Sequence, residues 1–102
     1  MASAQTIGFI GAGQLGEPTV LRLLDAGYAV TGYNRTRSKA QWLIDAGMQW
    51  ADSPRAVAEN SDITFSMVTD TRALAEITND LVSGLSTGKI FIDMSTVSPR
   101  FI

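Results

Sequence analysis

The feature that most constrains the fold of this chain is a run of glycines placed directly after a short apolar segment. Residues 6–10, TIGFI, are too short for a helix and are followed at once by glycine, which is typical of a buried parallel strand. The next six residues, GAGQLG, fit the pattern G-x-G-x-x-G. Residues 14–26 then place apolar side chains largely on one side of a helix that ends at Gly27. A strand, a tight loop and a helix in this order predict the start of a βαβ unit.

Each glycine of the loop has a separate physical role. Gly11 permits the tight turn off the strand, Gly13 lets the backbone approach a pyrophosphate, and Gly16 lets the helix pack against the sheet. The pattern also occurs in ordinary turns, but the flanking strand and helix favour dinucleotide binding, with the free amides of the helix facing the phosphates. The residues predicted to bind the pyrophosphate are Gly11, Ala12, Gly13, Gln14, Leu15 and Gly16.

The turn after the second predicted strand, residues 28–33, indicates which dinucleotide is preferred. NAD-binding units usually have Asp or Glu here, whose carboxylate accepts hydrogen bonds from the ribose hydroxyls. This chain instead has Asn34, Arg35 and Thr36, followed by Arg37. A carboxylate would repel a 2′-phosphate, whereas an amide, a hydroxyl and a guanidinium can bind one. The turn therefore predicts NADP rather than NAD, and Arg35 is favoured over Arg37 as the phosphate-binding residue.

The rest of the chain continues to alternate between helices and strands. Further helices are expected over residues 38–46, 54–59 and 71–82, and further strands over residues 48–51, 62–69 and 89–94. Five strands joined by right-handed crossovers predict a Rossmann-like, doubly wound parallel α/β sheet in the order 3-2-1-4-5. Ligands bind such sheets beyond the carboxyl ends of the strands, where the first and fourth strands diverge. Four of the five loops are therefore expected to converge on one crevice.

Composition agrees with one domain over residues 1–102. The chain is 45% hydrophobic and 18% charged, enough to bury roughly two thirds of its unfolded surface in one core. Its net charge of −2 gives no general attraction to nucleic acid or to an anionic membrane. The absence of cysteine and histidine excludes disulfides and argues against a transition-metal site. Neither a secretory signal nor a membrane-spanning stretch is recognised, so a cytoplasmic location is expected.

Four segments carry a resemblance to a known family: GFIGAGQLGEP, GYNRTRSKA, SDITFSMVTD and KIFIDMSTVSP. They resemble the N-terminal cofactor domain of the β-hydroxyacid dehydrogenases, which include 3-hydroxyisobutyrate dehydrogenase, tartronate semialdehyde reductase and the glyoxylate and succinic semialdehyde reductases. The coenzyme domain of 6-phosphogluconate dehydrogenase is also similar. The resemblance extends from about residue 6 to residue 99, and DMSTVSP, residues 93–99, is its most specific part.

The resemblance implies roles for residues beyond the glycine loop. Val68 and Thr69 would line the cofactor near its ribose, while Ser95 and Thr96 would lie beside the nicotinamide ribose and the carboxylate of a small hydroxyacid or semialdehyde. Taken without the resemblance, residues 93–96 are better interpreted as a strand end followed by a Ser/Thr turn or helix cap. The implied reaction is hydride transfer between nicotinamide and a carbon bearing oxygen, with a separate group moving the hydroxyl proton.

The chain also departs from the family pattern. Val68-Thr69 replaces a common Leu-Pro, and family members continue through a sixth strand, a catalytic lysine and a helical C-terminal domain that completes the pocket and the dimer. Neither Lys39 nor Lys89 is placed as that lysine, so no catalytic residue is expected in these 102 residues and turnover by them alone is not expected. The substrate stays unidentified, and a homo-oligomer is compatible with the resemblance.

Two other interpretations remain open at this level. The chain could be a self-standing nucleotide-binding or redox-sensing module, or a fragment of an imine reductase, which resembles it in the glycine loop and the Asn-Arg-Thr turn. Asp93 followed by Met94-Ser95-Thr96 argues against the imine reductase.

Overall fold

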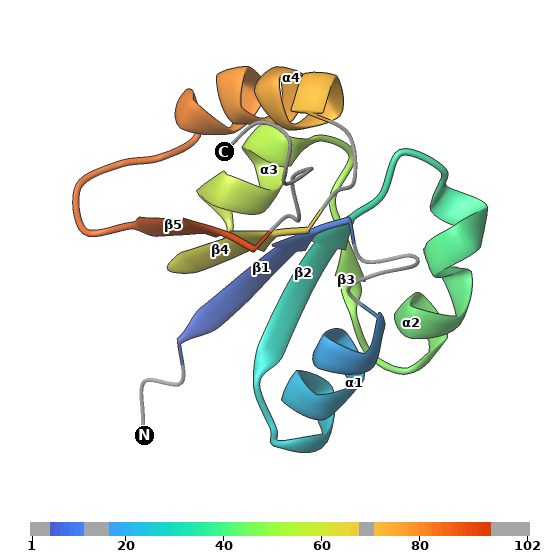
Figure 1. Ribbon diagram of the computed structural model, residues 1–102. Helices are drawn as coiled ribbons and strands as arrows, with labels where there is room; N and C mark the ends of the chain where they lie inside the picture. The colour runs from blue at the N-terminus through green and yellow to red at the C-terminus, as the bar shows by residue number, and fades with distance from the viewer. Residues whose placement is uncertain (1–4, 12–16, 68–70, 95–102) are drawn as a thin grey trace.

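The computed structural model describes residues 5–11, 17–67 and 71–94. Within them, five strands form one parallel sheet with helices on both faces (Figure 1). The strands are β1 (Thr6–Ile10), β2 (Ala29–Tyr33), β3 (Gln49–Trp50), β4 (Ile63–Ser66) and β5 (Ile90–Asp93). Their order is β3-β2-β1-β4-β5, and each neighbouring pair is parallel. The Rossmann-like sheet predicted from the sequence, in the order 3-2-1-4-5, is therefore confirmed.

The helices divide between the two faces of the sheet. They are α1 (Glu17–Asp25), the 3₁₀ helix η1 (Arg37–Ala40), α2 (Gln41–Asp45), α3 (Pro54–Glu59) and α4 (Thr71–Val82). Figure 1 shows α1 and α2 beside β1, β2 and β3, and α3 and α4 on the opposite side of the sheet. This division follows from right-handed crossovers, because the chain moves outward from β1 to β3 and then crosses to β4 and β5.

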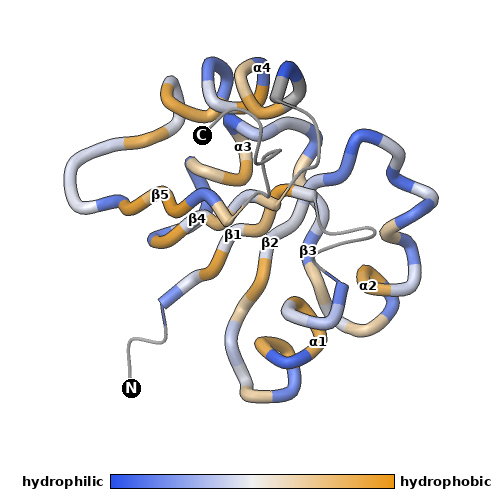
Figure 2. Tube along the Cα trace, in the orientation of Figure 1, coloured by the Kyte–Doolittle hydropathy of each residue, from blue (hydrophilic) through white to orange (hydrophobic). Residues whose placement is uncertain are grey.

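Successive side chains of β1 enter two separate apolar clusters. Phe9 is fully buried in a cluster with Val20 of α1 and Leu43 of α2. The next residue, Ile10, belongs to the cluster on the other face, with Val57 of α3. Successive side chains of a strand point to opposite faces, so one continuous apolar strand supplies both layers of the core. Figure 2 shows the corresponding concentration of hydrophobic residues along the central strands.

Two glycines allow close packing on the sheet. A Cβ added at Gly8 would lie 2.5 Å from Ser61 Oγ and 2.6 Å from Val57 Cγ1, closer than such atoms approach in proteins. A Cβ added at Gly32 would collide with the thioether of Met48. These positions have room only for glycine because α3 and the chain around it press directly against β1, and Met48 presses against β2.

The predicted helix over residues 38–46 is divided in the structure. A 3₁₀ helix, η1, comes first, and Lys39 N donates to Thr36 O over 3.1 Å in the i→i+3 pattern of such helices. The backbone at Ala40 then leaves the helical region, with φ −110° and ψ 4°, before α2 begins. Ala40 is fully buried in the cluster beneath α1 and α2, so tertiary packing at this residue accounts for the interruption.

The remaining differences concern the ends of elements. β3 contains two residues rather than the predicted four, and β4 ends at Ser66 rather than at residue 69. Residues 68–70 lie outside the described part of the chain, as do residues 14–16, where the first helix is predicted to begin. Of the helices that the structure describes, none has the length and apolar character needed to cross a membrane.

Candidate functional site

The carboxyl ends of β1, β2, β4 and β5 lie level along one side of the sheet. Ile10 pairs with Tyr33 on one side and with Ser66 on the other, and Ser66 pairs with Asp93. These four residues are the last of their strands. The loops that follow start from one line, which we call the carboxyl edge. Ligands of open parallel α/β sheets bind at this position, at the point where helices leave toward opposite faces.

Gly11 turns the chain sharply off β1 at the carboxyl edge. Its φ of 92° lies in the region that glycine adopts at low cost, as expected for the first glycine of the loop. Gly11 N donates to Tyr33 O over 2.9 Å, and on the other side of β1, Met67 N donates to Ile10 O over 2.9 Å. β1 is therefore held by both neighbours up to its last residue, and the loop leaves from a rigid base.

The other residues of the predicted pyrophosphate loop lie outside the described residues, and their contacts stay a prediction. They are Ala12, Gly13, Gln14, Leu15 and Gly16. The described part of α1 follows them, and its fully buried Val20 anchors that helix on the sheet.

The turn after β2 is organised by Asn34. Its Nδ2 donates to Thr36 O over 2.9 Å, so one of the two amide protons holds the shape of the turn. Thr36 has an extended backbone, with φ −109° and ψ 108°, and its side chain does not cap η1. Thr36 is exposed, and its hydroxyl makes no capping hydrogen bond to the helix that it precedes.

The two arginines of this turn have different surroundings. Arg35 is exposed and makes no hydrogen bond or ion pair with any residue in the described part of the chain. The Arg37 guanidinium lies over the ring of Trp50, with its carbon 5.6 Å from the ring centroid. Arg35 thus presents an unpaired cation beside the carboxyl edge, whereas the direction of Arg37 is determined by an aromatic neighbour.

Sequence reasoning missed Trp50 as a member of this region. Its ring centroid is 5.7 Å from that of Tyr33, and its Nε1 donates to Asp52 Oδ1 over 2.9 Å. Residues 48–51 indicated only a short outer strand, because their sequence carries no binding motif. A signal was nevertheless available: in a parallel sheet, the end of the third strand lies next to the end of the second, and Trp50 pairs with Gly32.

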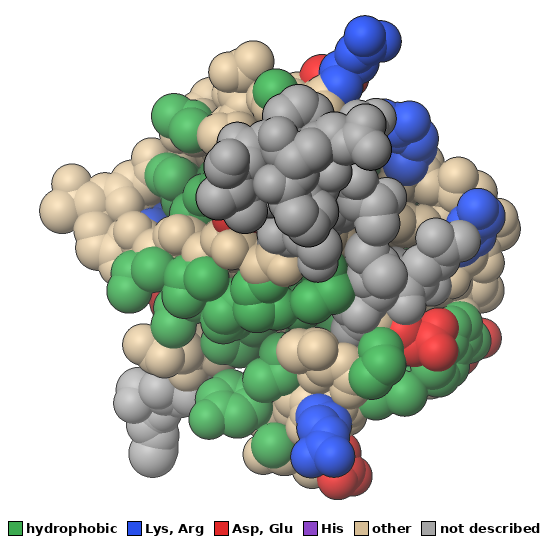
Figure 3. Space-filling model, viewed as in Figure 1, with side chains coloured by type: hydrophobic (Ala, Val, Ile, Leu, Met, Phe, Trp, Pro, Cys, Tyr) green, Lys and Arg blue, Asp and Glu red, His purple; other side chains and the backbone are tan. Residues whose placement is uncertain are grey.

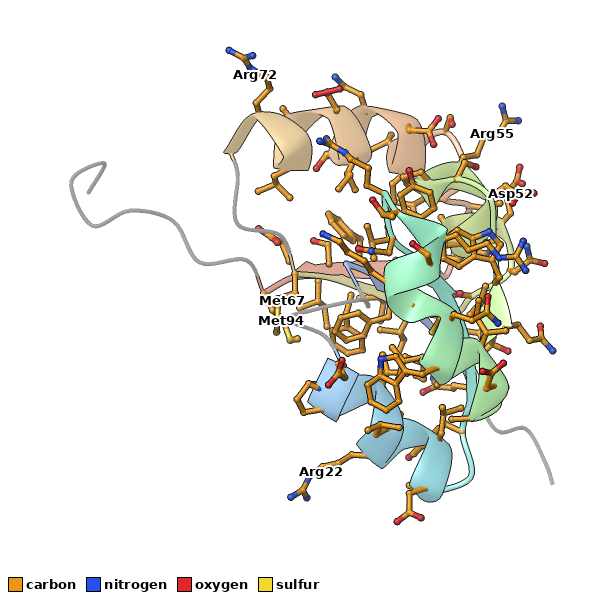
Figure 4. The ribbon with its side chains drawn as sticks, turned by 90° about the vertical axis from the view of Figure 1, so that its right-hand side faces the viewer. Arg22, Asp52, Arg55, Met67, Arg72 and Met94 are labelled. Atoms are coloured by element: carbon orange, nitrogen blue, oxygen red, sulfur yellow. The ribbon has the colours of Figure 1, made fainter. Side chains whose placement is uncertain are left out.

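The other half of the carboxyl edge is tied together by one side-chain hydrogen bond. Ser66 Oγ, fully buried, donates to Asp93 Oδ1 over 2.8 Å and joins the ends of β4 and β5. Met67 and Met94 follow these residues, and Figure 4 shows them beside each other where both strands end. Two thioethers therefore form an apolar surface next to the loops that follow.

Those loops contain the remaining predicted site residues. Val68, Thr69, Ser95 and Thr96 all lie outside the described residues. Their predicted contacts with cofactor and substrate stay predictions, although the strands that carry them end at the carboxyl edge.

Neither lysine of the chain follows β4 or β5 at the carboxyl edge. Lys89 precedes β5 at the opposite end of the sheet, and its Nζ donates to Ala58 O and Glu59 O, each over 2.7 Å, at the C-terminus of α3. Lys39 is exposed on η1. Across residues 5–11, 17–67 and 71–94, no cluster of three or more Asp, Glu, His or Cys residues could hold a metal ion.

Comparison with known proteins gives this geometry a context. A family model described as the NAD binding domain of 6-phosphogluconate dehydrogenase matches residues 6–101. The chain is 46% identical over 97 residues to an Arabidopsis thaliana protein named "Probable 3-hydroxyisobutyrate dehydrogenase-like 1, mitochondrial". That match covers 91% of this chain and 29% of the relative.

Solved structures show the same fold. A 3-hydroxyisobutyrate dehydrogenase from Mycobacterium tuberculosis, described with L-serine, has a TM-score of 0.86 and 25% identity over 94% of this chain and 33% of its own. An imine reductase from Myxococcus stipitatus, described with NADP+, has a TM-score of 0.83 and 30% identity over 93% of this chain and 33% of its own. Its V8 variant, described with NAD+, has a TM-score of 0.86 and 25% identity over 96% of this chain and 34% of its own. The chain spans between 29% and 34% of the length of these proteins.

Proposed function

Because the chain belongs to the family described as the NAD-binding domain of 6-phosphogluconate dehydrogenase, we propose that it holds NADP(H) for an oxidoreductase acting on a small 3-hydroxyacid or semialdehyde. The observation that carries the choice of NADP is the turn after β2. It has Asn34 where NAD-binding units usually have a carboxylate, and it presents the Arg35 guanidinium exposed and without a partner in the described residues.

The residues along the carboxyl edge fit such a cofactor. The left-handed turn at Gly11 supports the predicted pyrophosphate loop over residues 11–16. Asn34, Arg35 and Thr36 would bind the 2′-phosphate through a free amide proton, a guanidinium and a hydroxyl. Val68 and Thr69 would line the cofactor near its ribose.

The chemistry divides between cofactor and protein. Nicotinamide, when bound, supplies the hydride, and this chain binds it and orients it. Ser95 and Thr96 would bind the nicotinamide ribose and the substrate carboxylate. Lys89 is occupied at the end of α3, so we propose that a group outside this domain moves the proton.

An imine reductase is the second candidate, because a solved imine reductase is 30% identical over 93% of this chain. Two observations favour the hydroxyacid dehydrogenase: the relative at 46% identity carries that name, and Asp93 is fixed by Ser66 directly before the segment Met94-Ser95-Thr96. The relative is also named mitochondrial, so a cytoplasmic location stays a prediction.

Calorimetric titration with NADPH and NADH, side by side, tests the proposal. NADPH should bind more tightly at low ionic strength, and the difference should shrink as salt screens the exposed guanidinium. Adenosine 2′,5′-bisphosphate and 5′-AMP differ by the same 2′-phosphate, so titration with these two ligands tests the phosphate preference without nicotinamide. Equal affinity for NADPH and NADH at low ionic strength would remove the 2′-phosphate site from the proposal.

A further inference from the structure

Trp50 contacts both the end of β2 and the segment just beyond the following turn. Its indole lies against Tyr33, the last residue of β2, and under the guanidinium of Arg37. Neither contact belongs to the glycine loop or to residues 34–36. The indole therefore packs next to the predicted phosphate turn, although it belongs to β3, a different strand from the one that the turn follows.

Both the backbone and the ring of Trp50 are restrained. Trp50 pairs with Gly32, and the next residue, Ala51, donates its N–H to Gly32 O over 3.0 Å, so the backbone is fixed against β2. The hydrogen bond from Trp50 Nε1 to Asp52 Oδ1, 2.9 Å, fixes the ring. A residue restrained in both ways can orient a flexible neighbour.

Arg37 is that neighbour. It is exposed, makes no hydrogen bond or ion pair within the described residues, and its guanidinium lies over the face of the indole. A guanidinium that lies on an aromatic ring keeps its N–H donors in its own plane, where they remain available to an anion. Its outer face also stays open. An unrestrained arginine would instead lose rotamer freedom on binding a ligand.

We infer that Trp50 is a positioning residue for the adenosine half of the cofactor: its indole holds the Arg37 guanidinium beside residues 34–36, ready to contact the 2′-phosphate. The inference rests on the proposed function. It assigns a role to a residue of β3, outside the glycine loop and the phosphate turn. It also gives Arg35 and Arg37 different roles. Arg35 is a free phosphate ligand, whereas Arg37 is a second ligand whose orientation depends on Trp50.

The first test compares Trp50→Leu with Trp42→Leu. Trp42 lies on α2, is 42% exposed and makes no ring or cation–π contact with Tyr33 or Arg37, so its replacement removes an indole of equal size without removing those contacts. Cation–π contacts at exposed sites are modest, and we expect Trp50→Leu to weaken adenosine 2′,5′-bisphosphate binding by about two- to fivefold. Binding of 5′-AMP should be unchanged, and Trp42→Leu should match the wild type for both probes. Equal affinity of wild type and Trp50→Leu for the bisphosphate would overturn the inference.

The second test asks whether Trp50 acts through Arg37. In an Arg37→Ala background, Trp50→Leu should cause no further loss of bisphosphate affinity, since the guanidinium that it positions is gone. A full additional loss would show that Trp50 acts through general stability and would overturn the inference. Trp50→Phe retains an aromatic face and should keep most of the wild-type affinity. If circular dichroism shows that Trp50→Leu is unfolded, Trp50→Phe and Arg37→Ala are compared with the wild type in its place.

The third test reports on the indole itself. In a Trp42→Phe background, Trp50 is the only tryptophan, so its fluorescence reads the Arg37 contact directly. Adenosine 2′,5′-bisphosphate should change its emission, whereas 5′-AMP should change it less. If the wild type does not prefer the bisphosphate to 5′-AMP, the proposed function fails and the inference falls with it. If the wild type prefers the bisphosphate but Trp50 emission does not change when the bisphosphate binds, the inference about Trp50 fails and the proposed function stands.

Discussion

At the scale of single residues, we propose that cofactor choice depends on a few polar atoms at the end of β2. Asn34 holds the turn through Thr36 O, and Arg35 projects from it without a partner in the described residues. The fold itself does not select the cofactor, because one imine reductase is described with NADP+ and its V8 variant with NAD+. Substitutions at these two positions should therefore alter selectivity without altering the fold.

Arg35→Ala should weaken NADPH binding by about 10- to 150-fold, because a hydrogen bond to a charged group contributes about 1.5–3 kcal/mol. NADH has no 2′-phosphate, so its affinity should stay nearly unchanged. Calorimetry at low salt measures both. Arg22→Ala is the matched control: Arg22 carries the same charge and projects from α1 into solvent (Figure 4). A loss of equal size in both variants would mean that only the net charge matters.

Asn34→Asp should shift preference toward NADH. The carboxylate would repel the 2′-phosphate and accept hydrogen bonds from the ribose hydroxyls of NADH. It would also lose the donor to Thr36 O, so Asn34→Ala is needed as a control for the shape of the turn. Asn34→Ala should weaken NADPH binding without strengthening NADH binding. The idea is wrong if Asn34→Asp binds NADH no better than Asn34→Ala does.

At the scale of elements, the packing of α3 on β1 depends on close contact at Gly8. Ser61 Oγ is the atom nearest to a Cβ at that position, and it is buried without a hydrogen-bond partner in the described residues. The atom that would collide with a methyl group at Gly8 is therefore also a buried hydroxyl without a partner in the described residues. The sheet and helix gain contact area at the cost of one buried polar atom.

Gly8→Ala should lower the free energy of unfolding by about 1–3 kcal/mol, the usual cost of overpacking a core. Ser61→Ala alone should be neutral or stabilising, since it removes a buried hydroxyl that has no partner in the described residues. The double variant should recover part of the loss at Gly8. Urea denaturation of the three variants gives these values. Additive effects would contradict the contact between the two positions.

At the scale of the whole molecule, the sheet is asymmetric. β5 is the outer strand of the described sheet, and Ile90 and Ile92 on it are 52% and 41% exposed. They pair with Ile63 and Phe65 and so share the face on which α1 and α2 lie. Figure 3 shows hydrophobic side chains gathered across this region. Lysine often protects such edges, but Lys89 is engaged with α3 instead.

The 102-residue chain should therefore self-associate at high concentration through the β5 edge. Ile92→Lys should reduce this association, because a charge on the exposed face opposes pairing of two edges. Tyr28→Lys, at the amino end of β2, is the control: Tyr28 is 42% exposed but lies away from β5. Light scattering at rising concentration distinguishes the variants. A wild type that stays monomeric throughout would count against the prediction.

The sequence by itself determined the order of the elements, the parallel sheet and the family, because strand length, glycine spacing and turn residues are local signals. It also predicted the turn at Gly11, whose left-handed backbone the structure contains. The site residues over 12–16, 68–69 and 95–96 remain predictions made from the sequence.

Only the tertiary structure decided which side chains meet. Trp50 reaches Arg37, and Ser66 reaches Asp93, across 13 and 27 positions of the chain. The interruption at Ala40 depends equally on burial beneath α1 and α2. These contacts arise from the register between parallel strands and from packing between layers, both of which join residues that no local pattern connects.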